Sequence, residues 1–195
     1  DSAEKLVVAG AYAYIADDAG GLKIIDVTDP SDPSLTGSYN TGGNVYGVDV
    51  SGGYAYISNG HTGSSCLQII DISDPSQPVA CSFLEERISS FPGKIGSFMY
   101  TAYNSLSVGV IDVSDPFNPL LVHSREIGTR VYGVTCHDDK IFVATNIAGL
   151  VYKDYQPPQP VPTDIPAAAA LATPGPECSS SDIIFRNISG TITRE

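Results

Sequence analysis

The residues best suited to chemistry in this chain are aspartates that recur beside prolines. In "IIDVTDPSDP" (residues 24–33), Asp26, Asp29 and Asp32 follow one another at intervals of three. Calcium takes six to eight oxygen ligands, so such a loop could supply part of a calcium site, although the spacing is not that of an EF-hand. The competing interpretation is that Asp29, which precedes a proline, caps a turn through local hydrogen bonds.

Four cysteines are the other candidates for chemistry: Cys66, Cys81, Cys136 and Cys178. None lies in a Cys-x-x-Cys spacing, so the sequence gives no support to a zinc ribbon or to haem attachment. They are either reduced thiols or partners in one or two disulfides formed in an oxidising compartment. In a simple hairpin register, Cys66 and Cys81 are out of step, and Cys136 with Cys178 could tie the C-terminal tail to the preceding repeat.

The sequence shows no arrangement of residues typical of an enzyme. It contains no Ser-His-Asp order, no phosphate-binding glycine loop and no dinucleotide fingerprint. The three histidines, His61, His123 and His137, are far apart in the chain and are expected to be ordinary loop or rim residues. We therefore expect a protein that is not an enzyme, has no catalytic residues and needs no cofactor, with calcium as the one possible exception.

Charge and hydropathy restrict the partners. The chain has 195 residues, of which 22 are acidic and 10 basic, giving a formal charge of −12. This charge repels phosphate backbones and anionic lipid surfaces, so we expect no nucleic acid partner. No apolar run approaches the roughly 18 residues that a membrane-spanning helix needs, so membrane insertion is not expected either. The opening "DSAEKLVVAG" does not resemble a signal peptide, but it could be the end left after one is removed.

The aspartate-proline phrase is one part of a longer repeat. It recurs as "IIDISDPSQP" (69–78) and "VIDVSDPFNP" (110–119). The aspartates that mark the end of the preceding strand, Asp26, Asp71, Asp112 and Asp154, are 45, 41 and 42 residues apart. A period near 42 that contains several short strands is typical of a propeller.

Each repeat divides into four strands, which we expect in the second repeat at about 45–50, 54–58, 66–72 and 79–84. Ile69, Ile70 and Ile72 point to both faces of the third strand, and such a strand must be covered on both sides. Pro78 opens the fourth strand and cannot donate a backbone hydrogen bond, so that strand is expected at a sheet edge. Stacked blades with an exposed outer strand satisfy both conditions.

The sequence thus predicts an all-β, propeller-like array of about four four-stranded blades, as an incomplete or small ring, over residues 1–155. The blades are expected at about 5–44, 45–92, 93–130 and 131–155, the last without a convincing outer strand. A proline- and alanine-rich linker follows at 156–181. Residues 182–195 return to strand character and could begin a further module.

The terminal strand is a candidate interaction element. Ile184, Ile188 and Ile192 lie on one alternation. An extended segment of this kind could add to a sheet edge of this propeller, of a neighbouring copy or of a following domain. Asn187 begins an Asn-Ile-Ser triplet that fits the N-glycosylation pattern.

The segments "GLKIIDVTDPSDP", "CLQIIDISDPSQP" and "VYGVDVSGGYAYIS" closely resemble the LVIVD repeat of bacterial and archaeal secreted or surface proteins. The resemblance covers about residues 5–155 and implies an extracellular or cell-surface β-propeller without an attached catalytic set. We therefore expect a structural and interaction module that associates with itself or with another surface protein. A calcium- or glycan-binding propeller is the alternative. The ring could close alone, belong to a longer product or be completed by a neighbouring copy.

Overall fold

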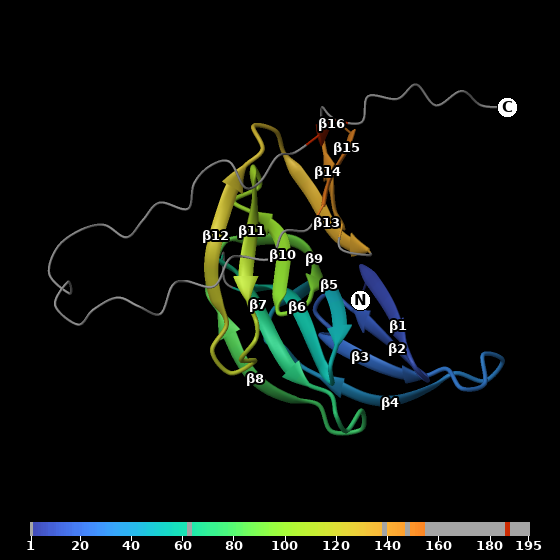
Figure 1. The fold of residues 1–195 in the computed structure, drawn as a ribbon. Coiled ribbons are helices and arrows are strands. Elements are labelled where there is room, and N and C mark those ends of the chain that lie inside the picture. The colour runs from blue at the N-terminus through green and yellow to red at the C-terminus, as the bar shows by residue number, and fades with distance from the viewer. Residues whose placement is uncertain (1, 62–63, 138–139, 147–148, 155–185, 188–195) are drawn as a thin grey trace, which may run out of the picture.

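The protein folds into four antiparallel sheets that follow one another round an arc (Figure 1). The computed structural model describes residues 2–61, 64–137, 140–146, 149–154 and 186–187, which form sixteen strands and no helix. The described ranges therefore contain no helix that could span a membrane.

Each sheet, or blade, has four strands in chain order. Blade 1 contains β1 (Lys5–Ala9), β2 (Tyr12–Ala16), β3 (Leu22–Asp26) and β4 (Ser34–Tyr39). Blade 2 contains β5 (Asn44–Ser51), β6 (Tyr54–His61), β7 (Ser64–Asp71) and β8 (Val79–Leu84). Blade 3 contains β9 (Ile88–Ile95), β10 (Phe98–Tyr103), β11 (Ser107–Asp112) and β12 (Leu120–Glu126). Blade 4 contains β13 (Val131–His137), β14 (Lys140–Thr145), β15 (Gly149–Asp154) and β16 (Arg186–Asn187).

The first strands of the blades lie on the inside of the arc. β1 contacts β5, β5 contacts β9, and β9 contacts β13, whereas the fourth strands β4, β8 and β12 are at sheet edges. This arrangement confirms the prediction of an all-β, propeller-like array. The strands of the second repeat also lie close to the expected positions.

The repeated decapeptide ends the third strand, turns the chain and begins the outer strand. In the first repeat, the amide of Asp32 donates to the carbonyl of Asp29 at 3.1 Å, which closes a turn with aspartate first and proline second. The strands β4, β8 and β12 then start directly after Pro33, Pro78 and Pro119. The prediction that proline opens an edge strand is therefore confirmed.

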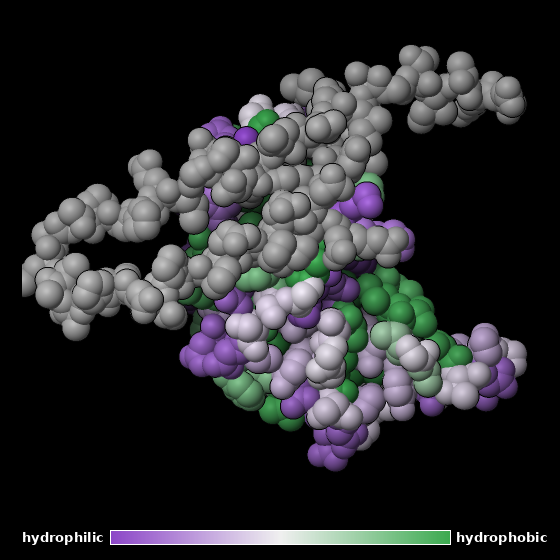
Figure 2. All heavy atoms as spheres, viewed as in Figure 1, coloured by the Kyte–Doolittle hydropathy of each residue, from purple (hydrophilic) through white to green (hydrophobic). Residues whose placement is uncertain are grey.

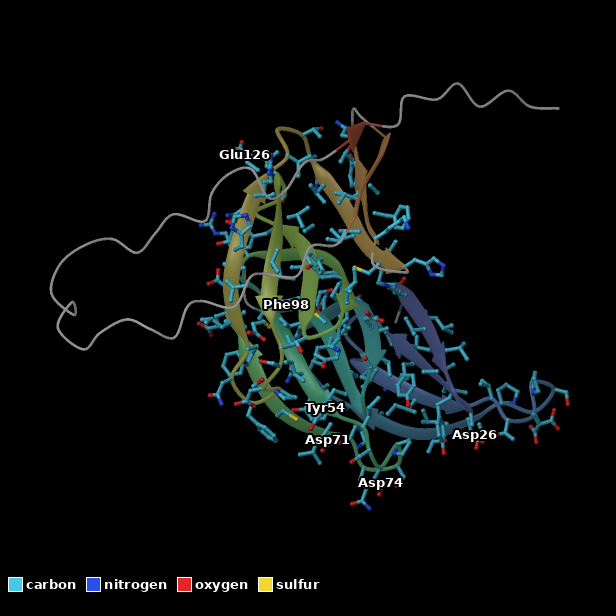
Figure 3. All side chains as sticks on the ribbon, viewed as in Figure 1. Asp26, Tyr54, Asp71, Asp74, Phe98 and Glu126 are labelled. Atoms are coloured by element: carbon cyan, nitrogen blue, oxygen red, sulfur yellow. The ribbon has the colours of Figure 1, made fainter. Side chains whose placement is uncertain are left out.

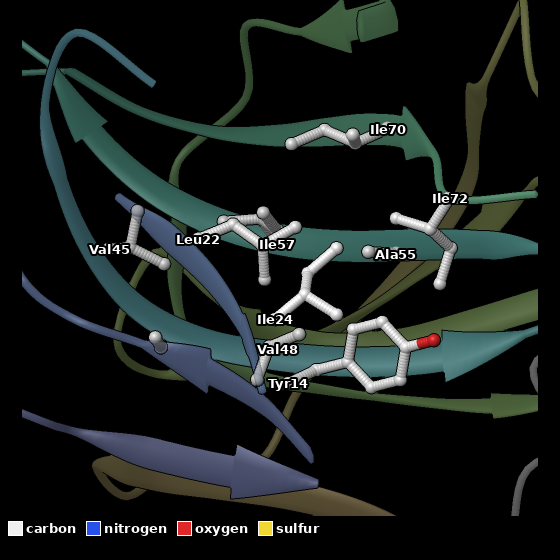
Figure 4. Close-up of a cluster of buried hydrophobic side chains, with 10 residues drawn as sticks. Tyr14, Leu22, Ile24, Val45, Val48, Ala55, Ile57, Ile70 and Ile72 are labelled. Atoms are coloured by element: carbon white, nitrogen blue, oxygen red, sulfur yellow. The ribbon is translucent and has the colours of Figure 1, made fainter. Parts of the chain in front are cut away.

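Apolar side chains between neighbouring blades form the core. Figure 4 shows Tyr14, Leu22 and Ile24 of blade 1 facing Val48 and Ile57 of blade 2. A second core lies between blades 2 and 3, and a third between blades 3 and 4. Equivalent tyrosines of the second strands are buried in these cores: Tyr14, Tyr56 and Tyr100.

The third strand of blade 2, β7, contacts a neighbouring blade on each of its faces, which explains why its sequence is apolar on both sides. Ile70 belongs to the core shared with blade 1, whereas its neighbour Ile69 belongs to the core shared with blade 3. Both side chains are 0% exposed. An alternating strand between two blades therefore buries every apolar side chain.

Two regions differ from the sequence-based expectations. Blade 3 begins at Ile88, inside the range expected for blade 2, and its β9 contains Pro92 beside a shift in the pairing with β10. A proline fits there because β9 is the inner edge of its sheet. In blade 4, Val151 and Tyr152 of β15 pair with Asn187 and Arg186 of the C-terminal tail, which takes the place of the outer strand.

We expect Ile57→Ala to lower the free energy of unfolding by about 2–5 kcal/mol, because it leaves a cavity between blades 1 and 2 where Ile57 is 0% exposed. Leu35→Ala is the matched control, since Leu35 is 63% exposed on the outer strand β4. Urea denaturation of both variants measures the effect. Equal losses in the two variants would contradict the stacked-blade core.

Candidate functional site

The candidate aspartates of the first repeat hold local turns. The amide of Thr28 donates to Oδ1 of Asp26 at 2.8 Å, and the amide of Ser31 donates to Oδ1 of Asp29 at 2.9 Å. Hydrogen bonds from the side chain and backbone of Ser31 lower the pKa of Asp29 below its ordinary value. These contacts agree with the turn-capping interpretation.

The same pair of turns recurs in the other repeats. Asp71 and Asp74 accept from the amides of Ser73 and Ser76. Figure 3 shows Asp26, Asp71 and Asp74 at the periphery of the molecule, away from the inner strands. Among the described residues, no group of three or more His, Cys, Asp or Glu side chains is arranged to hold a metal ion. Calcium binding by Asp26, Asp29 and Asp32 stays a prediction.

The structure reveals a polar cluster that the sequence did not indicate. We call Lys5 of β1, Asp49 of β5, Lys94 of β9 and Cys136 of β13 the inner-strand cluster, because each comes from the first strand of a different blade. The amide of Lys94 donates to Oδ2 of Asp49 at 3.2 Å, and the amide of Val50 donates to Oδ1 at 2.9 Å. Blades 2 and 3 are thus joined by a direct hydrogen bond.

Burial controls the electrostatics of the inner-strand cluster. It raises the pKa of Asp49, against the opposing effects of the hydrogen bonds and of the charges on Lys5 and Lys94. It also lowers the pKa of both lysines, against the attraction of Asp49. Asp49 thus interacts electrostatically with Lys5 of blade 1 and Lys94 of blade 3, and burial outweighs these interactions at all three groups.

The thiol in the inner-strand cluster is poorly suited to act as a nucleophile. Burial, with a smaller contribution from the charge of Asp49, raises the pKa of Cys136 to about 12. The thiolate is the reactive form of cysteine, and this environment disfavours it. The cluster therefore has the character of a structural charge centre.

The three described cysteines, Cys66, Cys81 and Cys136, are free thiols. Pairing of β7 with β8 places Leu67 opposite Leu84, so Cys66 and Cys81 are out of register, as expected from the sequence. Cys178 lies outside the described residues, as do Ile184, Ile188 and Ile192 of the candidate interaction strand. Asn187 is placed in β16 by its backbone pairing alone.

The geometry above defines a propeller-like repeat protein. The model of the LVIVD repeat matches residues 2–41, 42–82 and 95–126, which together exceed half of the chain. The chain belongs to the LVIVD repeat family, as the repeated phrases suggested. A search of curated proteins gave no match.

Three of the solved structures that match share the fold at low sequence identity. The computationally designed Ika4 protein matches at 10% identity over 80% of this chain and 92% of its own, with a TM-score of 0.59. The designed Ika8 protein matches at 8% identity, over 76% of this chain and 44% of its own, with a TM-score of 0.55. BamB from Moraxella catarrhalis matches at 14% identity over 74% of this chain and 43% of its own, with a TM-score of 0.56. This chain thus spans less than half of the Ika8 and BamB chains.

We expect Asp49→Asn to change how stability depends on pH. Burial raises the pKa of Asp49 above its ordinary 3.8, so the folded chain binds this proton more tightly than the unfolded chain. The resulting stabilisation is fully present below the unfolded pKa and is lost as the pH rises through the folded pKa. The unfolding free energy of the wild type minus that of the variant should therefore fall as the pH rises from the ordinary pKa of 3.8 through the higher folded pKa.

Asp29→Asn provides a control of opposite sign. Hydrogen bonds lower the pKa of Asp29, so its contribution is present above the unfolded pKa and is lost as the pH falls through the folded pKa. For Asp29→Asn, the unfolding free energy of the wild type minus that of the variant should therefore rise with pH. Urea denaturation across the pH series measures both, and parallel curves would contradict the assignment at Asp49.

Proposed function

We propose that this chain is a non-enzymatic interaction module that is secreted or displayed at the cell surface, where it assembles with protein through its end blades and its tail. The observation that carries the proposal is an exposed apolar surface on blade 1. Leu6 and Val8 of β1 are 53% and 59% exposed, whereas the corresponding faces of blades 2 to 4 are packed against a preceding blade. Figure 2 shows hydrophobic residues gathered in the region of β1 and β2. Exposed apolar patches of this kind are typical of protein interfaces.

Three further properties support the proposal. The pairing of β15 with β16 illustrates strand addition by the tail, which is a known mode of recognition. The raised pKa of Cys136 disfavours nucleophilic chemistry in the inner-strand cluster. The charge of −12 favours solubility and opposes binding to nucleic acid. Membership of the LVIVD repeat family is consistent with placement outside the cell.

Replacement of residues 182–195 by a glycine-serine sequence of equal length is expected to weaken assembly, because it removes the segment that contains β16. Native mass spectrometry of the wild type and the variant measures the change in assembled fraction. A second variant with the same replacement confined to 163–176 controls for the composition of the tail. Unchanged assembly after loss of 182–195 would contradict a role for the tail.

Calcium binding is the alternative function, favoured by the recurrence of the same two turn aspartates in three repeats. We expect the melting temperature to be equal in calcium and in chelator, because Asp26 and Asp29 already accept hydrogen bonds from the turns they close. A higher melting temperature in calcium that disappears in Asp29→Asn would support the alternative. The equivalent Asp74→Asn tests whether each repeat would hold its own ion.

A further inference from the structure

The exposed face of blade 1 has apolar residues at the same positions as the face of blade 2 that is buried against blade 1. The β1–β2 hairpin pairs Ala9 with Tyr12, and the β5–β6 hairpin pairs Ser51 with Tyr54, which aligns the two blades residue by residue. Leu6 then corresponds to Val48, and Ile15 corresponds to Ile57. Val48 and Ile57 are 0% exposed because blade 1 covers them.

This alignment defines what would cover blade 1. We call the surface formed by Leu6, Val8 and Ile15 the leading face. In blade 2, the matching surface contacts the second strand of the preceding blade, where Tyr14 and Ala16 are buried. The leading face therefore has apolar residues at the positions that contact the second strand of a preceding blade elsewhere in the chain.

Blade 4 carries the complementary surface. By hairpin register, Phe142 and Ala144 of β14 correspond to Tyr56 and Ser58 of β6, and we call them the trailing face. The equivalent Ala16 and Ala102 are 0% exposed between blades, whereas Ala144 is exposed. The trailing face is apolar at the positions that the internal interfaces bury.

The two faces do not cover each other within one chain. The three cores join blade 1 to 2, blade 2 to 3 and blade 3 to 4, and none among the described residues joins blade 4 to blade 1. Leu6 and Ala144 both remain exposed in the folded chain. The trailing face of a second copy of this chain would fit the leading face of blade 1.

We infer that two copies of this chain form a closed ring, in which the trailing face of each copy covers the leading face of the other. A two-fold axis makes both contacts identical and leaves no blade face uncovered, so the assembly stops at two. The ring extends the series of three internal interfaces by the same type of contact. The chain covers 44% of Ika8 and 43% of BamB, so two copies approach the length of one such chain.

This inference rests on the interaction function proposed above, and its test separates the two. Light scattering during size-exclusion chromatography should give twice the mass of one chain for the wild type. Leu6→Glu and Ala144→Glu should each weaken dimerisation by about 100-fold or more, because each buries an unpaired carboxylate. Leu35→Glu, on the outer strand β4, is the matched control and should stay dimeric. Val8→Lys repeats the test with the opposite charge, and circular dichroism checks that each variant is folded.

Mixing the two glutamate variants tests the pairing of unlike faces. The Leu6→Glu chain keeps an intact trailing face, and the Ala144→Glu chain keeps an intact leading face, so their mixture should recover a two-chain species through one contact. The ring would be overturned if the mixture stayed monomeric or if the wild type were monomeric. It would also be overturned if the wild type formed a concentration-dependent series of larger species, or if the Leu6→Glu chain stayed dimeric. A dimeric Leu6→Glu chain that dissociates when residues 182–195 are replaced would overturn the ring and leave the proposed function standing.

Discussion

The fold depends on the need to cover the third strand of each blade on both faces. Ile69 and Ile70 are adjacent in β7, point in opposite directions and are both fully buried. Burial of one such side chain contributes roughly 1.5–3 kcal/mol, so a blade with one bare face gives up much of its stabilisation. Blades of this composition therefore stack, and every stack that does not close leaves an apolar surface at each end.

Local chemistry explains how much of this architecture could be predicted. The Asp-Pro turn and the prolines that open β4, β8 and β12 act within a few residues, so the strands around them were placed correctly from the sequence. The predicted start of blade 3 at about residue 93 was wrong, because the start of β9 at Ile88 depends on pairing with β10. The inner-strand cluster was also missed. In the sequence, Asp49 is one polar residue in an alternating strand. Only the folding of the other three blades places Lys5, Lys94 and Cys136 near it.

The fourth blade shows the same limit at longer range. The sequence indicated both a repeat without an outer strand and a strand near the C-terminus, yet no local signal joined them. In the structure, Arg186 and Asn187 pair with β15 across a linker of about thirty residues. Closing so long a loop costs only slightly more entropy than closing a short one, which makes the pairing feasible without making it predictable.

The prolines at the outer strands have a consequence for crowding. Pro33, Pro78 and Pro119 stand at the start of the rim strands, where they interrupt the row of amide donors that a foreign strand would need. Molecules held close together, as on a densely covered surface, would therefore resist fusing rim to rim into fibrils. The prolines thus disfavour strand pairing at the start of each outer strand, and they leave contacts between blade faces unaffected.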